Sequence, residues 1–158
     1  MEKYFKKERS IPSNFNIDDL TECQKIAFNN FLIGDNIFIT GPAGTGKTYL
    51  IKKLKEYCDF SHIDVAVTAM TGCAAYLIHG NTLHSWSGIG LGKSPISSIV
   101  KKIRTRPYLR TRWKNVKVLI IDEISMLDKE LFEKLDDIAQ NIRGNMLPWG
   151  GIQLCFFG

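Results

Sequence analysis

The sequence predicts an α/β domain in which a parallel β-sheet carries helices on both faces. Apolar runs of strand length alternate with segments whose apolar residues recur at helical spacing. One of these strands leads directly into a glycine-rich loop and then a helix. This alternation is typical of parallel strands joined by right-handed helical crossovers. A chain of 158 residues is long enough for one such domain with its own hydrophobic core.

The N-terminal part is expected to divide into a tail and the start of the domain. Residues 1–16 are polar and show no periodicity, so we expect a flexible tail ahead of a domain over residues 17–158. The first helix is expected to begin at Thr21, because Thr21 and Gln24 have the spacing of a capping box. Gly34 is expected to end this helix.

Four apolar runs are expected to form the sheet. The first is a short buried strand, and the third is nearly all apolar, as in a strand covered on both faces. The expected strands cover residues 37–40, 63–68, 116–121 and 152–157.

Capping residues, prolines and glycines predict where the remaining helices begin and end. Ser94 and Pro95 are expected to serve as the cap and the first residue of one helix, which Pro107 ends. Gly144 is expected to stop the last helix. These helices are expected to begin near Lys47, Thr71, Ser94 and Asp128.

Composition and cysteine use limit the class of protein. A hydrophobic share of 44% indicates a packed core. No apolar run reaches the roughly 18 residues of a membrane span, and the charged N-terminus does not resemble a secretory signal. We therefore expect no membrane partner and a reducing intracellular compartment, whether nuclear or cytoplasmic. The cysteines, which have no zinc-ligand spacing, are expected to be small buried hydrophobes: Cys23, Cys58, Cys73 and Cys155.

The formal net charge of +5 suits a polyanionic partner, and its distribution is uneven. Seven cations lie within residues 101–114, interleaved with Tyr108 and Trp113. Cations for phosphates and aromatic faces for bases are typical of proteins that bind single strands. A solvated basic face on an amphipathic helix explains the pattern equally well, so both interpretations remain open.

The chemistry of the chain centres on a phosphate-binding loop. Residues 41–48 match the pattern G-x-x-x-x-G-K-[ST] between a predicted strand and a predicted helix. The glycines let backbone N–H groups converge on phosphate oxygens, Lys47 reaches the β- and γ-phosphates, and Thr48 offers a hydroxyl to Mg²⁺. The expected nucleotide-binding residues of this loop are Gly41, Pro42, Ala43, Gly44, Thr45, Gly46, Lys47 and Thr48.

A second glycine-spaced stretch has a different interpretation. Residues 88–92 resemble part of a dinucleotide fingerprint, but no strand precedes them. We expect a flexible loop there.

Two carboxylates follow the third predicted strand. Asp122 is expected to hold Mg²⁺, and Glu123 is expected to orient or deprotonate the attacking water. Having both a metal ligand and a water activator favours a hydrolysing ATPase over a small-molecule kinase. Gln24 has two interpretations, because its amide could read an adenine edge or complete only the capping box.

Three segments together resemble the PIF-type DNA helicases, superfamily 1 motors related to RecD. They cover residues 67–75, 81–90 and 119–126, and the resemblance extends over about residues 17–158. It implies a RecA-like P-loop domain that uses ATP and Mg²⁺ to move 5′ to 3′ on single-stranded DNA. It also implies roles in DNA repair, recombination and telomere maintenance.

The resemblance assigns further residues. Gln24 matches the adenine-reading glutamine of the family. The segment at residues 152–157 is expected to lie between the strand before the phosphate loop and the strand before Asp122. The residues that match the two DNA-contact motifs are Thr68, Thr71, Gly72, Thr82 and His84. For His84, a purely structural role stays open.

The family also carries a second motor domain with transition-state arginines, which these 158 residues do not include. By themselves they are expected to bind ATP as a monomer and to hydrolyse it very slowly. Two other functions remain open: a non-motor, nucleotide-dependent binding module, and a P-loop ATPase of another class such as a clamp-loader-type remodeller.

Overall fold

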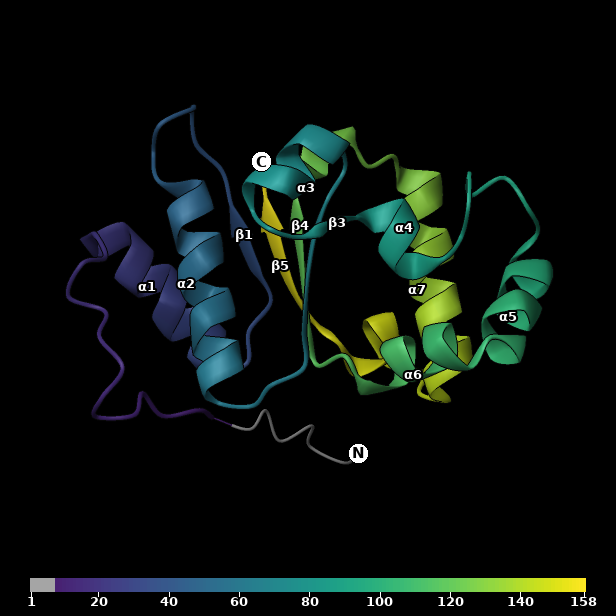
Figure 1. Ribbon diagram of the computed structural model, residues 1–158, viewed down its shortest axis with the longest axis horizontal. Coiled ribbons are helices and arrows are strands. Elements are labelled where there is room, and N and C mark those ends of the chain that lie inside the picture. Colours follow the sequence, from purple (N-terminus) through teal and green to yellow (C-terminus); the bar gives the residue numbers. More distant parts are fainter. Residues whose placement is uncertain (1–7) are drawn as a thin grey trace.

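A five-stranded parallel sheet forms the centre of the molecule in the computed structural model, which describes residues 8–158 (Figure 1). The strand order is β1-β5-β4-β2-β3, and each neighbouring pair is parallel. The predicted α/β class with a parallel sheet is therefore confirmed. The strands are β1 (Ile37–Ile39), β2 (Val65–Ala69), β3 (Asn81–Thr82), β4 (Val118–Asp122) and β5 (Gln153–Phe157).

Helices cover both faces of this sheet, with α1 and α2 on one side and α4 to α7 on the other (Figure 1). The helices are α1 (Glu22–Leu32), α2 (Lys47–Phe60), α3 (Gly72–Leu77), α4 (Leu83–Ser87), α5 (Ile96–Thr105), α6 (Pro107–Asn115) and α7 (Lys129–Arg143). Two short 3₁₀ helices, η1 (Ile124–Met126) and η2 (Pro148–Gly151), complete the structure.

The sheet divides the apolar core into two clusters. In β4, Val118 and Ile120 face the cluster with α1, α2 and α3, whereas Leu119 and Ile121 face the cluster with α4 to α7. Successive side chains of a strand point to opposite faces, so a strand buried on both sides must be apolar throughout. This explains the nearly continuous apolar run that predicts β4.

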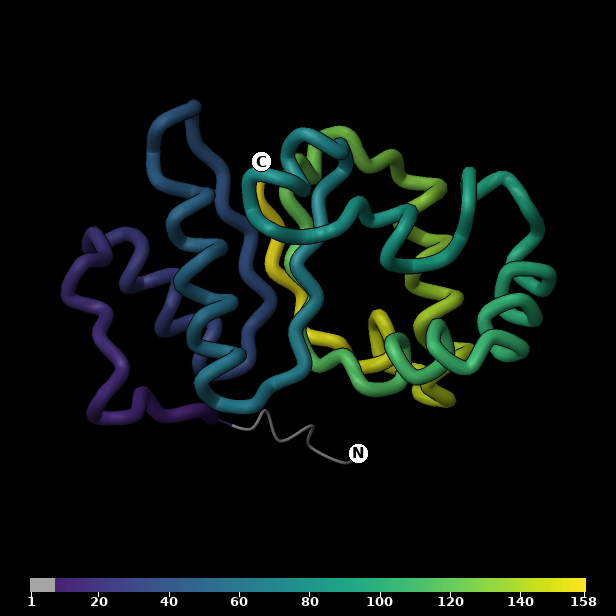
Figure 2. Tube along the Cα trace, viewed as in Figure 1, coloured from purple at the N-terminus to yellow at the C-terminus, as the bar shows by residue number. Residues whose placement is uncertain are grey.

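The position of β5 agrees with the expectation from the resemblance. It pairs with β1 on one side, with Ile37 opposite Cys155, and with β4 on the other. The tube in Figure 2 shows the end of the chain beside the start of the loop after β1. Backbone hydrogen bonds join Gly41 N–H to the Gly158 carbonyl at 3.2 Å and Gly158 N–H to the Ile39 carbonyl at 3.0 Å.

The predicted burial of β1 is wrong for one face. β1 is one of the two edge strands, and the cluster with α4 to α7 contains no residue of it. Phe38 points to that side and is 63% exposed. Only Ile37 of this strand is fully covered.

Most helix ends follow the predicted caps, but the segment between α4 and β4 differs. Thr21 makes both bonds of the capping box, and Asp128 caps α7. Ser94 does not cap α5, whose N-cap is Pro95. Pro107 begins a second helix, α6, because fixed φ suits the first helical turn and α6 buries Trp113 in the core.

The expected flexible tail over residues 1–16 includes a part that packs on the domain. Residues 1–7 lie outside the described part of the chain, and residues 8–16 form no helix or strand. Phe15 nevertheless packs in the core against Phe28 and Tyr57, and Tyr57 Oη donates to the Ser10 carbonyl at 3.0 Å. Aromatic burial therefore attaches this segment to the domain.

Only two of the four cysteines are buried as expected. Cys58 and Cys155 lie in the core, where burial raises the pKa of Cys58 to about 12 and also raises the pKa of Cys155. Cys23 and Cys73 are exposed, because each lies in the first turn of its helix on the solvent side. No helix in residues 8–158 is long and apolar enough to cross a membrane.

Candidate nucleotide site and its neighbours

The loop between β1 and α2 has the backbone form that a bound phosphate requires. Gly44 and Gly46 adopt φ of +83° and +85°, which side chains other than glycine rarely tolerate. A Cβ on Gly46 would lie 2.6 Å from Gln24 Nε2. Because Gly46 is the N-cap of α2 and supplies no capping side chain, N–H groups of the first turn are left for an anion.

Lys47 folds back over this loop. Its ammonium donates to the Gly41 carbonyl and, at 3.0 Å, to the Pro42 carbonyl. The Thr45 hydroxyl donates to the same Pro42 carbonyl at 2.9 Å, which closes the loop into a turn. The ammonium thus lies inside the curl of the loop, and Thr48 is exposed beside it.

A pocket of about 330 Å³ adjoins the loop and is lined by residues of α1, β1 and α2. Gln24 lies in its wall and confirms the capping interpretation, because Oε1 accepts from Thr21 N–H at 2.9 Å. Its other amide atom, Nε2, donates to the Gly46 carbonyl at 3.1 Å. The Gln24 side chain therefore links the start of α1 to the phosphate loop. It does so at the place where the adenine base of a nucleotide is expected.

Asp122 ends β4, and Glu123 begins the turn after it. Asp122 Oδ1 accepts from Glu123 N–H at 2.9 Å. Partial burial raises the pKa of Asp122, and the charge of Lys47 acts in the opposite direction. A cation placed at Asp122 would relieve this burial of negative charge. Glu123 has φ of +56°, an uncommon conformation for a residue with a side chain.

The side chain of Glu123 makes a contact that the sequence did not predict. Its Oε2 accepts a hydrogen bond of 2.8 Å from the Thr71 hydroxyl. The register pairs Ala69 with Asp122, so both residues follow the ends of neighbouring strands. Neither the adjacency of β2 and β4 nor the side-chain conformation that joins these two groups was predicted from the sequence.

The candidate DNA residues fall into two groups. Thr71 and Gly72 follow β2, and Thr82 ends β3, where the register pairs it with Ala69. Thr82 caps α4 by accepting from Ser85 N–H, and His84 lies half-buried in that helix. These residues share the carboxyl edge of the sheet.

Thr68 does not belong with them, and its assignment to a DNA contact is wrong. The side chain is completely buried within β2. Its hydroxyl donates to the Ile120 carbonyl of β4 at 2.7 Å, so it supports the sheet and cannot reach a ligand.

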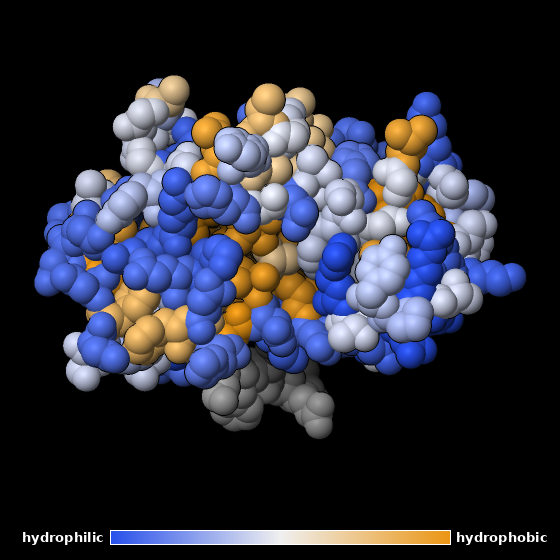
Figure 3. Space-filling view, viewed as in Figure 1, coloured by the Kyte–Doolittle hydropathy of each residue, from blue (hydrophilic) through white to orange (hydrophobic). Residues whose placement is uncertain are grey.

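The basic segment occupies α5 and α6, and strongly hydrophilic residues cover these helices in Figure 3. Trp113 cannot stack on a base, because it is fully buried and donates to the Ser87 carbonyl at 3.0 Å. Tyr108 is 59% exposed, with the Arg112 guanidinium 5.9 Å from its ring centroid. Among residues 8–158, no ion pair neutralises a cation of α5 or α6.

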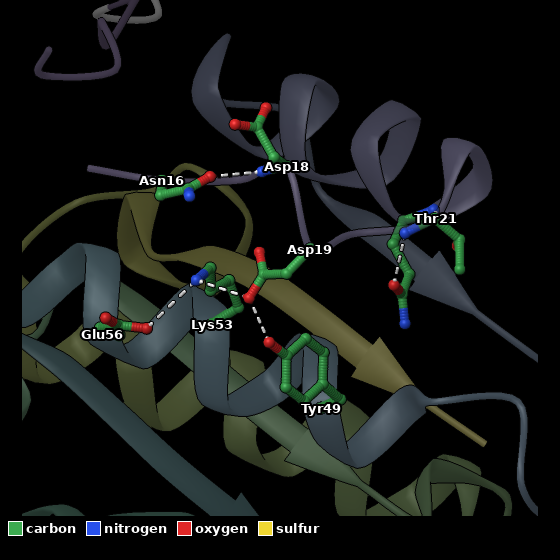
Figure 4. A network of polar contacts seen from close by, with 8 residues as sticks. Asn16, Asp18, Asp19, Thr21, Tyr49, Lys53 and Glu56 are labelled. Atoms are coloured by element: carbon green, nitrogen blue, oxygen red, sulfur yellow. Dashed lines mark hydrogen bonds and ion pairs between the residues drawn. The ribbon is translucent and has the colours of Figure 1, made fainter. Parts of the chain in front are cut away.

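A polar network joins the segment before α1 to α2 (Figure 4). Asp19 accepts from the Tyr49 hydroxyl and, at 3.1 Å, from the Lys53 ammonium, which lies 3.6 Å from Glu56. Hydrogen bonds from Tyr49 and Lys53 lower the pKa of Asp19. Burial lowers the pKa of Lys53, but its contacts with Asp19 and Glu56 outweigh burial and leave it raised.

Comparison with known proteins gives a consistent result. A family model described as PIF1-like helicase matches residues 19–158. The ATP-dependent DNA helicase PIF1 of Emericella nidulans is 53% identical over 129 residues, which cover 79% of this chain and 17% of that protein. The chain thus spans about a sixth of the length of this relative.

Solved structures agree with the sequence comparison. The crystal structure of Pif1 helicase from Candida albicans is 45% identical with a TM-score of 0.84, covering 90% of this chain and 33% of that one. A Bacteroides Pif1 helicase in complex with ADP-AlF3 and ssDNA is 32% identical with a TM-score of 0.72, covering 88% and 32%.

Proposed function

Because the chain belongs to the PIF1-like helicase family, we propose that it is the ATP-binding motor domain of a 5′-to-3′ DNA helicase. The observation that carries this proposal is the loop between β1 and α2, with Lys47 folded inside it and Gln24 at its edge. Roles in DNA repair, recombination and telomere maintenance would follow from the same membership.

The nucleotide would lie along the loop in one orientation, with its base and its phosphates at opposite ends. Its base would meet Gln24, and its phosphates would replace the carbonyls that the Lys47 ammonium now contacts. Gly44 and Gly46 leave the backbone N–H groups open to the phosphate oxygens. ATP is thus the ligand whose parts match the arrangement of these groups.

Mg²⁺ fits the oxygen groups beside the phosphates. The Thr48 hydroxyl and the Asp122 carboxylate would hold it, with phosphate oxygens and water as the other ligands. No group of three or more metal-binding side chains exists within residues 8–158. This agrees with an ion that depends on the nucleotide for much of its coordination. Mg²⁺ would neutralise charge on the phosphates, while Glu123 would orient water.

Single-stranded DNA is the proposed second ligand. Thr71, Gly72, Thr82 and His84 would contact its backbone, since they share the carboxyl edge of β2 and β3. One Bacteroides relative was solved with ssDNA, which supports this proposal. The chain would act as a monomer in a reducing intracellular compartment, where Cys23 and Cys73 stay free.

A nucleotide titration tests the proposal. Lys47→Ala should weaken the binding of a fluorescent ATP analogue with Mg²⁺ by at least tenfold, since hydrogen bonds to charged groups contribute roughly 1.5–3 kcal/mol each. Lys52→Ala is the matched control, because Lys52 is an exposed lysine of the same helix. Equal affinity of the Lys47 variant and the parent would reject the site.

The non-motor binding module is the second candidate. A pocket whose described lining contains no arginine fits this candidate as well as it fits the motor domain. Such a module would bind a partner protein in a nucleotide-dependent way and show no response of ATP affinity to oligo(dT). A clamp-loader-type ATPase is not retained, because the family assignment excludes it.

A further inference from the structure

The geometry points to the Thr71 hydroxyl as a positioning group that holds Glu123 away from the nucleotide until single-stranded DNA takes its place. The inference rests on the proposed function, because it requires DNA at Thr71 and ATP at Lys47. Its basis is the 2.8 Å hydrogen bond between Thr71 Oγ1 and Glu123 Oε2.

The direction of this bond follows from the sheet order. β4, which carries Glu123, lies between β5 and β2. The phosphate loop follows β1, on the β5 side, whereas Thr71 follows β2 on the opposite side. Glu123 is therefore turned toward the strand that lies farther from the phosphates. A carboxylate in this position is not directed at water beside a bound γ-phosphate.

The hydroxyl of Thr71 cannot serve two acceptors. Its lone pair already accepts from Ala74 N–H at 3.2 Å, which caps α3, and its single proton goes to Glu123. A hydroxyl has one proton to donate. A DNA phosphate that accepts from Thr71 must therefore displace Glu123.

The coupling must be reciprocal. If DNA releases Glu123 from Thr71, then Glu123 opposes DNA binding by the same factor. Removing the carboxylate should therefore tighten DNA binding, and this can be measured without any ATP hydrolysis.

The experiment measures oligo(dT) binding by anisotropy at low salt. Glu123→Ala should bind about fivefold or more tightly than the parent, the order expected when one hydrogen bond to a charged group no longer competes. Glu130→Ala is the matched control, because it removes an exposed carboxylate of α7 that has no contact with Thr71. Its affinity should change by less than about twofold.

Two further variants separate the hydrogen bond from simple charge repulsion. In a Thr71→Val background, Glu123→Ala should have no further effect, since valine has no proton to donate. Glu123→Gln should tighten binding less than Glu123→Ala, because its amide oxygen still accepts from Thr71. This second comparison stands even if loss of the α3 cap unfolds the Thr71 variant, which circular dichroism would show.

The outcomes are distinct. Equal tightening by Glu123→Ala with and without Thr71, or by the alanine and glutamine variants alike, would overturn the coupling and leave the proposed function intact. Absence of oligo(dT) binding by the parent chain would reject both the DNA contact and this inference.

Discussion

Gln24 joins two roles that look like alternatives in the sequence. Oε1 completes the cap of α1, and Nε2 contacts the carbonyl of Gly46 in the phosphate loop. A residue chosen only for capping would need the first contact alone. The second contact places the same amide in the pocket wall, so one side chain both caps α1 and lines the proposed nucleotide site.

Gln24→Glu separates these roles. Glutamate at this position caps a helix as well as glutamine does, so thermal stability should stay within about 2 °C of the parent. A carboxylate cannot donate to the Gly46 carbonyl, and it lacks the donor that an adenine edge requires. ATP affinity should therefore fall by about tenfold, while affinity for tripolyphosphate changes much less. Isothermal titration of both ligands provides the measurement, and equal losses for the two would contradict a contact with the base.

Among the elements, those defined by local signals could be predicted from the sequence. The Thr21 and Asp128 caps and the phosphate loop between β1 and α2 were all identified in this way. Strand β3 was not, because two residues carry no periodic signal. Helix α6 was missed because a proline interrupts the helical pattern, and only tertiary packing shows that Trp113 is buried.

In the candidate site, too, local features could be predicted from the sequence and contacts between distant segments could not. The position and form of the loop proposed to bind nucleotide could be predicted from spacing, since the motif is local. The burial of Thr68 and the bond between Thr71 and Glu123 depend on strand neighbours far apart in the sequence. Such contacts are set by strand order and rotamers, for which one sequence gives no signal.

The polar contacts that join the segment before α1 to α2 predict how one substitution changes the stability of the fold. Asp19→Asn removes the charge that faces Lys53, which is 9% exposed, and Tyr49 (Figure 4). The variant should unfold at a lower temperature than the parent at neutral pH. Asp18→Asn is the control, because its carboxylate is exposed and its neighbour Asn16 contacts only its backbone.

The pH dependence of this effect follows from the two pKa shifts. The pKa of Asp19 is lowered, so its contribution is complete above the unfolded value near 3.8 and is lost as pH falls through the folded value. The pKa of Lys53 is raised, so the contribution of Lys53 to stability is complete below the unfolded value of 10.5. That contribution is lost as pH rises through the folded value. Thermal scans of Asp19→Asn should thus approach the parent in strong acid. An unchanged difference there would contradict the ion pair.

On the scale of the whole molecule, the parallel sheet brings the two proposed ligand sites to one edge. The phosphate loop follows β1, the acidic pair follows β4, and the candidate DNA residues follow β2 and β3. Ligands of open parallel sheets bind at the carboxyl ends of the strands. We propose that this edge binds ATP through Lys47 and couples ATP binding to the binding of single-stranded DNA.

We expect the groups at this edge to bind nucleotide better than they hydrolyse it. No arginine lines the described part of the pocket, and in related P-loop enzymes an arginine finger contributes about 10³–10⁵ in rate. Its absence should appear in kcat, while affinity depends on the loop, Mg²⁺ and Gln24.

The most direct test measures MgATP binding and phosphate release on one preparation of the 158-residue chain, with and without oligo(dT), over a range of protein concentrations. We predict saturable MgATP binding that Lys47→Ala weakens by at least tenfold, an ATP affinity that responds to oligo(dT), and phosphate release slower than about one turnover per minute. Absence of MgATP binding, or an affinity indifferent to oligo(dT), would contradict the coupled site. Rapid DNA-stimulated release at low concentration would show that these residues already contain a complete motor.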